Sequence, residues 1–297
     1  MPTKAASEKS LSGEPSVRKE RSGLHTPKLL YRRPASAIGT TIVLLFLLLA
    51  LFGPLIAPYG ENEQIAADAR QPPSAAHLFG TDRLGRDVFS RVVLGTRDIL
   101  ALAGLGTILA VISGTIFGLV SGYLGGLFDE GVMRFFDSLL AIPALLLALL
   151  LIGTVGSSLG SVLIVIVIVY TPIVARVVRS VVLPVKNLGY VEAARTQGES
   201  TGSILYREIL PSVAPALTVE AALRFSYAIF LVASLGFLGV GAQPPTPDWG
   251  LMVSEARHNV SQTPWAMYFP AAAIAILVIG VNLMADGLKR ALQDSDG

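Results

Sequence analysis

Uninterrupted apolar stretches, each long enough to cross a lipid bilayer, follow one another along this 297-residue chain. A helix needs roughly 20 apolar residues to span the hydrocarbon core, because each residue adds only about 1.5 Å to its length. Six stretches qualify, so the sequence predicts an all-α integral membrane protein with six transmembrane helices. Their approximate bounds are Ala35–Ala57, Ile99–Leu124, Leu139–Val155, Leu159–Val178, Ala214–Gly239 and Phe269–Leu288.

Composition agrees with this class and excludes several others. Mean hydropathy is +0.62 and only 15% of the residues are charged. The chain has no cysteine, which rules out disulfides and thiolate metal sites, and we expect no metal and no cofactor in this chain. A net charge of +2 gives no support to nucleic-acid binding. No G-x-x-x-x-G-K-[ST] phosphate loop occurs, so any ATP that drives this protein must be bound by a partner.

The basic residues predict the orientation in the membrane. They are dense in residues 1–34, which we interpret as a disordered cytoplasmic tail, and basic segments prefer the cytoplasmic side. Six crossings then return the C-terminal tail, 289–297, to the cytoplasm. The segment 35–98, the first helix with an external loop, argues the other way because the loop is rich in arginine. Its arginines are Arg70, Arg83, Arg86, Arg91 and Arg97.

Small residues recur at every fourth position of the second predicted helix. This spacing lets another helix approach closely, which favours helix packing inside a membrane. We therefore expect this face to contact protein rather than lipid. The residues are Gly106, Ala110, Gly114, Gly118 and Gly122.

One stretch matches the G-x-S-x-G pattern of hydrolase nucleophiles, at Gly156 to Gly160. That pattern requires a strand-to-helix turn and a histidine partner. Here it joins two apolar helices, and the histidines, His25, His77 and His258, belong to the tail or to loops. We therefore predict no catalytic role for it.

The polar stretch EAARTQGESTGSILYREILP, 192–211, lies between the fourth and fifth predicted spans. Residues 192–197 can form one or two helical turns, Gly198 permits a chain reversal, and Ser200 or Thr201 can cap a second helix that ends near Leu210. Pro211 then marks the change into the fifth span. With an alanine pair on its exposed turn, the first short helix is suited to dock into a groove of another protein.

This stretch resembles the EAA loop of bacterial ABC importer permeases, a coupling helix that docks on an ATPase subunit. Isoleucine stands directly before Leu-Pro here, whereas the general pattern places it one position earlier, and this arrangement is typical of the peptide and nickel branch. The residues implied to couple to the ATPase are Glu192, Ala193, Ala194, Gly198, Ile209, Leu210 and Pro211.

Three further stretches resemble the "C"-type permeases of that dipeptide, oligopeptide and nickel branch. They are HLFGTDRLGRD at 77–87, SLGFLGVGAQPPTPDWG at 234–250, and ADGL at 285–288. The resemblance implies the type I importer transmembrane fold, with a core permease domain over 99–288 and its coupling loop at 188–211. It also implies a location in the bacterial cytoplasmic membrane, in contact with lipid.

The same resemblance implies a set of partners. These are a second, B-type permease, two ATP-binding subunits or a fused pair that bind ATP and Mg, and an extracytoplasmic solute-binding protein. Turn glycines, alternating charges and prolines in the two outer loops suit an ordered cap that receives the binding protein or braces the helix ends. The cap candidates are Gly80, Thr81, Asp82, Gly85, Arg86, Asp87, Gln243, Pro244, Pro245, Asp248 and Trp249.

Glu220 and Arg224 are the candidates for the translocation path. They lie four residues apart with the acid first, so they can pair on one helix face. Ionisable groups within a membrane usually face a bundle interior or a watery path. An ion pair with a purely structural role is the alternative.

We therefore expect a non-catalytic permease subunit of an ATP-driven importer, forming half of the pathway, with di- or oligopeptides as the leading cargo. Nickel or another small solute is the alternative cargo. A self-sufficient secondary transporter would usually show internal repeats or broken helices, and it would leave the coupling stretch unexplained.

Overall fold

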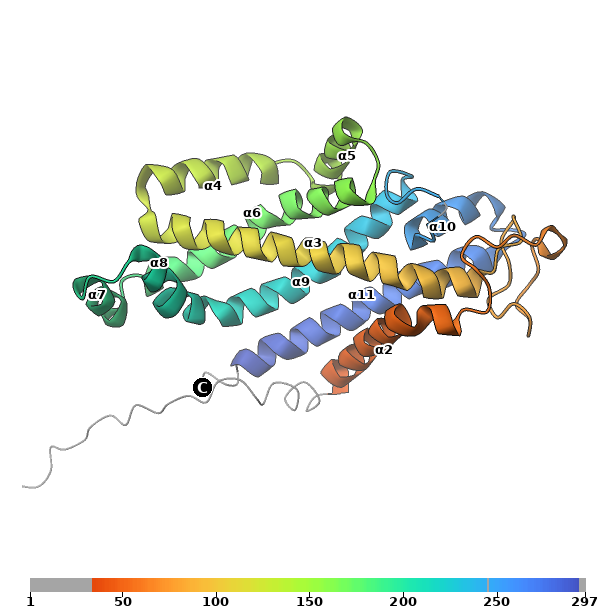
Figure 1. Cartoon of the computed structure of the whole chain (residues 1–297), viewed down its shortest axis with the longest axis horizontal. Helices are drawn as coiled ribbons and strands as arrows, with labels where there is room; N and C mark the ends of the chain where they lie inside the picture. Colours follow the sequence, from red (N-terminus) through yellow and green to blue (C-terminus); the bar gives the residue numbers. More distant parts are fainter. Residues whose placement is uncertain (1–33, 245, 294–297) are drawn as a thin grey trace, which may run out of the picture.

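The computed structural model describes residues 34–244 and 246–293 as an elongated bundle of helices (Figure 1). Residues 1–33 of the predicted N-terminal tail, Pro245 and residues 294–297 lie outside this range. Short 3-10 turns occur at η1 (Ala66–Asp68) and η3 (Arg257–Asn259), and η2 (Ile204–Ile209) is π-helical. The α-helices are α2 (Pro34–Ile56), α3 (Val88–Leu124), α4 (Gly126–Leu140), α5 (Ala144–Val155), α6 (Leu159–Val185), α7 (Gly189–Thr196), α8 (Thr201–Ser203), α9 (Leu210–Phe237), α10 (Trp249–Ala256) and α11 (Pro264–Gln293).

Five helical segments of the described chain are long and apolar enough to cross a membrane, and one bent pair could supply a sixth crossing. The five lie at Pro34–Ile56, Val88–Leu124, Leu159–Val185, Thr201–Phe237 and Pro264–Leu292. The bent pair is α4 with α5, whose axes differ by 92°. The count of six crossings therefore depends on treating this pair as one span.

The prediction of one continuous helix over the third span, Leu139–Val155, was wrong. α4 ends at Leu140, and α5 starts at Ala144, immediately after Pro143. Proline lacks the N–H that a helix interior needs, and it disfavours helical backbone at the residue before it, which is Ile142. The chain therefore turns near the start of the apolar run.

The start of the second span was also predicted too late. Asp87 caps α3 by accepting a hydrogen bond from the Ser90 backbone N–H at 2.7 Å. The helix therefore begins at Val88 rather than Ile99, and it includes Arg91 and Arg97, which the sequence had placed in a loop.

Small residues on α3 form the close contact with α6, as predicted. A Cβ atom added to Gly106 would lie 2.6 Å from a side-chain carbon of Ile166, and one added to Gly114 would lie 2.6 Å from Val174 Cβ. The same holds one and two turns further on, so bulk at this face is excluded along most of α3. Lipid does not reach this stripe.

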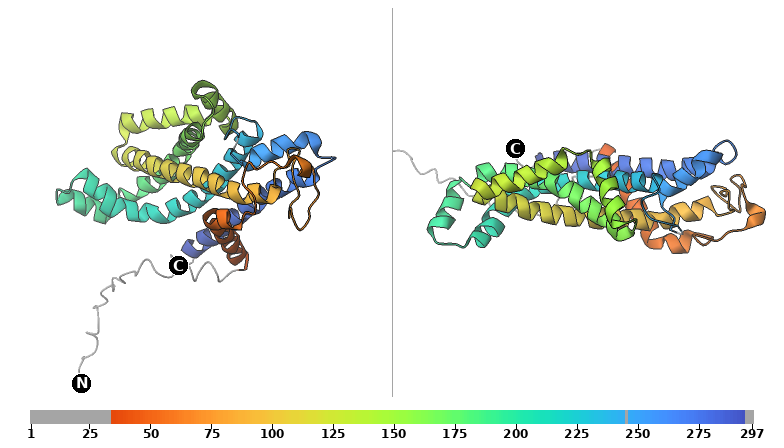
Figure 2. Two further views of the ribbon diagram at one scale, coloured as in Figure 1. Left: turned by 45° about the vertical axis from the view of Figure 1, so that its right-hand side comes forward. Right: turned by 90° about the horizontal axis from the view of Figure 1, so that it is seen from above.

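A second close contact joins α2 to α11, which lie side by side (Figures 1 and 2). A Cβ on Gly39 would lie 2.6 Å from the Gly280 carbonyl oxygen, and one on Gly287 would lie 1.9 Å from Ser36 Oγ. The ADGL stretch therefore holds the first and last membrane helices together, with Ala285 buried.

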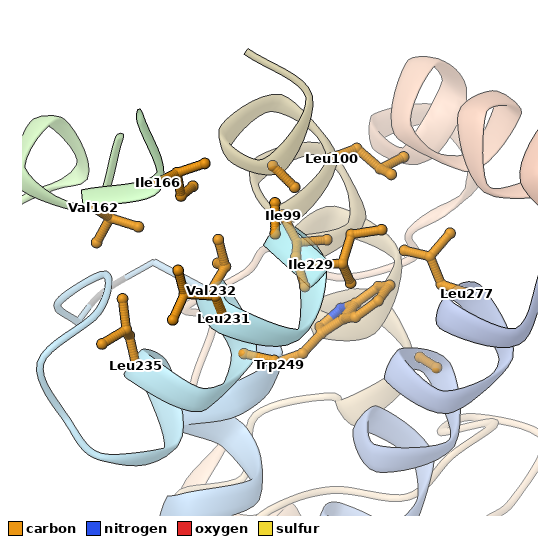
Figure 3. Close-up of a cluster of buried hydrophobic side chains, with 14 of the residues drawn as sticks. Ile99, Leu100, Val162, Ile166, Ile229, Leu231, Val232, Leu235, Trp249 and Leu277 are labelled. Carbon is orange, nitrogen blue, oxygen red and sulfur yellow. The ribbon is translucent and has the colours of Figure 1, made fainter. Parts of the chain in front are cut away.

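The main hydrophobic core lies where α3, α6, α9, α10 and α11 meet (Figure 3). Trp249 is fully buried there beside Ile229 and Leu277, and its indole N–H donates to the Val92 carbonyl at 2.9 Å. α7 and α8 occupy one end of the bundle, whereas α10 and the loop before α3 occupy the other (Figure 1). The two sets of sequence motifs thus lie at opposite ends.

Candidate functional site

The stretch at residues 192–211 folds as a helix, a reversal and a second helix. Gly198 ends the α7 segment with φ +78°, a left-handed conformation that favours glycine, and an added Cβ would meet no atom within 4 Å. Ser200 then caps α8 by accepting a hydrogen bond from the Ser203 N–H at 3.3 Å. The predicted reversal and cap are both confirmed.

The alanine pair does not share one exposed face, so this part of the prediction was wrong. Ala193 is exposed, whereas Ala194 is only 6% exposed and packs beneath the helix. Successive residues are about 100° apart around a helix, so neighbouring alanines point in different directions. The face that remains available to a partner carries Glu192 and Ala193.

A compact inner core supports α7. Val191 and Ala194 pack with Val178 and Val182 of α6 and with Ile209 of η2. All five side chains are at most 6% exposed. The short helix is therefore built into the bundle rather than suspended on a loop.

Polar contacts add to this support. The hydroxyls of Tyr190 and Ser212 lie 3.2 Å apart and join α7 to α9. The Arg195 guanidinium lies 5.3 Å from the centre of the Tyr123 ring. A push on α7 would consequently reach α3, α6 and α9 through packed side chains.

Pro211 lies in the first turn of α9 and so marks the change from η2 into this helix, as predicted, but the helical segment does not break there. The helical segment is continuous from Thr201 to Phe237, and the π-helical turn η2 comes directly before Leu210 and Pro211. A proline removes one backbone donor and clashes with the carbonyl four residues earlier in a regular helix. Here the proline lies in the first turn of α9, directly after the π-helical turn, and the chain stays helical through it.

Glu220 and Arg224 pair with each other on α9, as the spacing predicted. Arg224 Nε lies 2.8 Å from Glu220 Oε1 without hydrogen-bond alignment, and the two side chains are 12% and 10% exposed. The Arg224 guanidinium also lies 4.8 Å from the Tyr227 ring centre and 5.7 Å from that of Tyr170 on α6. The pair faces protein in this chain.

Sequence reasoning missed a second set of charges within the helices. Arg179 of α6 holds Asp129 of α4 through two hydrogen bonds of 2.6 Å each, and Arg176 pairs with Asp137 further along the same two helices. The signal was present, because ionisable residues inside apolar spans mark partners or pathways. These two pairs fasten α4 to α6.

The GTDRLGRD stretch lies at the end of the bundle opposite α7, here called the outer end, and most of its residues are buried (Figure 1). Thr81, Arg86 and Asp87 are at most 6% exposed. Gly80 and Gly85 have φ values of +70° and +76°, and a Cβ on Gly85 would lie 2.1 Å from the Ile65 carbonyl oxygen. These residues brace the helix ends.

Ion pairs complete this brace. Arg86 Nε lies 2.5 Å from Asp82 Oδ2, and its Nη2 lies 2.6 Å from Glu255 Oε2 of α10. Burial lowers the pKa of Arg86, but the charges of Asp82 and Glu255 outweigh burial and raise the pKa above its ordinary value. The cap is therefore a charged network between the loop and α10.

The proline-rich loop divides into exposed and buried parts. Gln243 and Pro244 are exposed, whereas Asp248 and Trp249 are buried. Asp248 caps α10 by accepting from the Leu251 N–H at 2.8 Å and packs against Gly236. Among the described residues of this loop, the exposed side chains therefore lie in its first part.

The structure bears on two further sequence features, the G-x-S-x-G stretch and possible metal ligands. Ser158 caps α6 by accepting a hydrogen bond from the Ser161 N–H at 3.0 Å, which gives the G-x-S-x-G stretch a structural role. Among residues 34–244 and 246–293, no group of three or more histidine and acidic residues could hold a metal ion.

Comparison with protein families gives two matches along the chain. Residues 114–295 match the model of the binding-protein-dependent transport system inner membrane component. Residues 28–73 match the N-terminal transmembrane domain of oligopeptide transport permease C.

Individual relatives are similar over nearly the whole length. A dipeptide transport system permease protein, DppC of Alkalihalophilus pseudofirmus, is 40% identical over 89% of this chain and 87% of its own. A glutathione transport system permease protein, GsiD of Pectobacterium atrosepticum, is 39% identical over 89% of this chain and 88% of its own. The solved MetNI methionine ABC transporter in an inward-facing conformation shares the fold, with a TM-score of 0.56 and 20% identity over 68% of this chain and 96% of its own.

Proposed function

The chain belongs to the family of binding-protein-dependent transport system inner membrane components, and from this premise we propose that α7 is the surface that receives force from an ATPase subunit. It is a non-catalytic, "C"-type permease of an ABC importer, a multi-span protein of the inner membrane. Such a permease works with a partner permease and with ATPase subunits that hydrolyse ATP.

The observation that carries this proposal is the way α7 is presented. Glu192 and Ala193 face outward at one end of the bundle, while Val191 and Ala194 fix the opposite face of the same helix to the inner core. A partner that seats against Ala193 would meet a small side chain on a rigid base. Displacement of that partner would move α6 and α9 together with α7.

The remaining partners follow from the same assignment. The second permease is of the B type, the ATPases are two subunits or a fused pair that bind ATP and Mg, and a solute-binding protein approaches the opposite end. Gln243 and Pro244 are exposed residues that we assign to that approach, together with the exposed Arg83 and Leu84 of the loop before α3. The buried cap residues hold these loops in shape.

Peptide is the cargo that we propose. The relatives are named for dipeptides and for glutathione, which is itself a small peptide. Nickel or another small solute is the alternative cargo. The bend between α4 and α5 is the kind of broken helix that secondary transporters use, but a secondary transporter would have no use for α7.

The test is the addition of a positive charge to the exposed face of α7. Ala193→Arg places a long cation on the docking face without touching the inner core, so we expect ATPase co-purification and uptake to fall at least tenfold while the membrane level stays normal. Gln243→Arg, an exposed change at the opposite end, is the control and should retain the ATPase. Full co-purification by Ala193→Arg would contradict the assignment of α7.

A further inference from the structure

Helix α4 carries charged side chains on its exposed surface, although it packs between apolar spans. Glu130 and Arg134 pair with each other one turn apart, and Asp137 pairs with Arg176 of α6. The side chains of Asp137 and Arg176 are 55% and 48% exposed, so this chain leaves the pair largely uncovered. Charges that face lipid are costly, which means that this surface needs an environment other than lipid.

The depth of the Asp137–Arg176 pair follows from its neighbours on α3. The ring of Phe136, next to Asp137, lies 5.5 Å from the ring of Phe117. Phe117 in turn lies about 10 Å along α3 from its last residue, Leu124. Leu124 is itself 57% exposed, so the apolar surface of the bundle continues past the level of the pair towards α7. The pair is therefore level with the apolar part of the spans.

The bundle has another face at this depth that is well suited to lipid. Residues 99–128 contain no charged residue. Large apolar side chains recur on the exposed surface of α3 at helical spacing, at Leu105, Ile108, Ile112 and Ile116. At one depth, then, α3 presents an uncharged surface, whereas α4 and α6 present a charged one.

The two ion pairs that join α4 to α6 differ in strength. Arg179 holds Asp129 through two hydrogen bonds, and these side chains are 32% and 11% exposed. Such a paired arrangement fixes the geometry of both partners. The Asp137–Arg176 pair is more exposed, and water competes for both of its charges, so it contributes little to stability. It can therefore open while the Asp129–Arg179 pair keeps α4 in place.

We propose that the α4–α6 face, formed by Glu130, Arg134, Asp137, Ser138 and Arg176, lines a water-filled translocation path, where Asp137 and Arg176 separate to hold the two charged ends of a peptide. The guanidinium would bind the C-terminal carboxylate through two parallel hydrogen bonds, and the Asp137 carboxylate would accept from the N-terminal ammonium. The charged side chains of this face balance in sign, which matches a zwitterion. This inference rests on the proposed function as a peptide permease and adds the residues that meet the cargo.

A single introduced thiol tests whether the α4–α6 face meets water, since the chain has no cysteine of its own. Ser138→Cys places the thiol on this face, and Ile116→Cys places one at an exposed position of the uncharged α3 surface as the matched control. The probe is methanethiosulfonate ethylsulfonate, an anion that does not enter lipid. It should modify Ser138→Cys at least about tenfold faster, because it reacts with the thiolate and apolar surroundings keep a thiol protonated.

The rates are measured on the assembled importer in lipid nanodiscs, without nucleotide and with ATP plus vanadate, and the mass of the modified chain reports the reaction. Faster modification of Ser138→Cys in at least one of these states is the expected result. Equally slow modification of both variants in both states would overturn the proposal, because lipid or the partner permease would then cover the face.

Protection by a peptide tests the role of the Asp137–Arg176 pair. Dialanine at about 10 mM should slow the modification of Ser138→Cys at least about twofold if its Kd is of that order, whereas sucrose at the same concentration should not. Adding Asp137→Asn and Arg176→Gln should remove the protection. Because the exposed pair contributes little to stability, the Tm should change little. Protection that survives this double change would overturn the role of the pair.

These outcomes are separate from the test of α7, because Ala193→Arg changes the opposite side of the coupling and leaves α4 untouched. Loss of the ATPase assignment would leave the two thiol rates as they are. A fast-reacting thiol at position 138 that dialanine does not protect would overturn the peptide site, whatever the result at Ala193.

Discussion

At the scale of single residues, Gly198 illustrates a requirement that comes from the backbone alone. Its φ of +78° disfavours every residue with a Cβ, although there is open space around it. Gly202, four residues later, is also exposed and free of neighbours but sits in the helical conformation of α8. The two glycines therefore separate conformational strain from steric effects.

We expect Gly198→Ala to destabilise the α7 turn by about 1–2 kcal/mol, because an L-residue is strained in the left-handed region. Gly202→Ala should instead be neutral or stabilising by up to about 1 kcal/mol, since alanine favours helix. Thermal unfolding and ATP-driven uptake measured in parallel check both variants. Equal losses for the two would contradict the backbone explanation.

Asp248 gives a prediction that depends on pH. Burial raises its pKa from 3.8 to about 6, although backbone hydrogen bonds from Leu251 and Gly250 favour the ionised form. The folded chain therefore holds this proton more tightly than the unfolded chain. Its contribution to stability is present below about pH 4, falls as the pH rises to about 6, and is absent above that pH.

Asp248→Asn keeps the side-chain oxygen that caps α10 but cannot ionise. At about 1.4 kcal/mol per pKa unit, the variant should gain up to about 3 kcal/mol over wild type at pH 7 and little at pH 4. Thermal unfolding across this range checks the prediction. Parallel pH profiles for variant and wild type would show that another group titrates.

Residue roles were only partly predictable from the sequence. Gly198 and the Ser200 cap follow from local backbone rules, which need no tertiary information. The burial of Ala194 and of Trp249 depends on which face of a short helix meets the core, and single-residue chemistry does not decide that. Arg91 was placed in a loop because a charge at the end of an apolar run usually lies outside a helix.

At the scale of elements, α9 carries an ion pair, and substitution of one or both members can distinguish a structural role from a role in the translocation path. Glu220 and Arg224 are both nearly buried. Removing one member of a buried pair leaves an uncompensated charge and costs about 3–5 kcal/mol, whereas replacing both by apolar residues is often nearly neutral.

We therefore expect Glu220→Leu or Arg224→Leu to lower the Tm and the membrane level strongly, and the double variant to recover most of the loss. Uptake by the double variant then assigns the role. Normal uptake indicates a structural pair, whereas a folded but inactive double variant indicates that the pair lines the path. A double variant as unstable as the singles would contradict the ion-pair explanation.

The elements themselves were predicted unevenly. Long apolar runs gave α2, α6 and α11 because length and hydropathy suffice to define a span. Two prolines had opposite effects on the helices around them. The helix breaks at Pro143, whereas it continues through Pro211. Helices α6 and α11 also continue through Pro172 and Pro270, so a proline alone does not decide where a helix breaks, and the sequence pattern around it does not reveal the outcome.

At the scale of the whole molecule, orientation remains a prediction from the basic residues. A reporter fused after Asp296 should be cytoplasmic, and one inserted beside Glu63 should be external, because basic segments stay on the cytoplasmic side. Paired alkaline phosphatase and fluorescent-protein fusions measure both positions. The reverse pattern would place α7 outside the cell and remove it from any ATPase.

The unbroken helical segment from Thr201 to Phe237 has a consequence for signalling between the two faces of the membrane. At about 1.5 Å per residue it is roughly 55 Å long, and Gly236 at its far end touches Asp248, the cap of α10. A tilt of about 5° at the inner end displaces the outer end by about 5 Å. If α7 receives an ATPase as proposed, the nucleotide state of that ATPase becomes readable at the opposite end of α9, with no ligand crossing between.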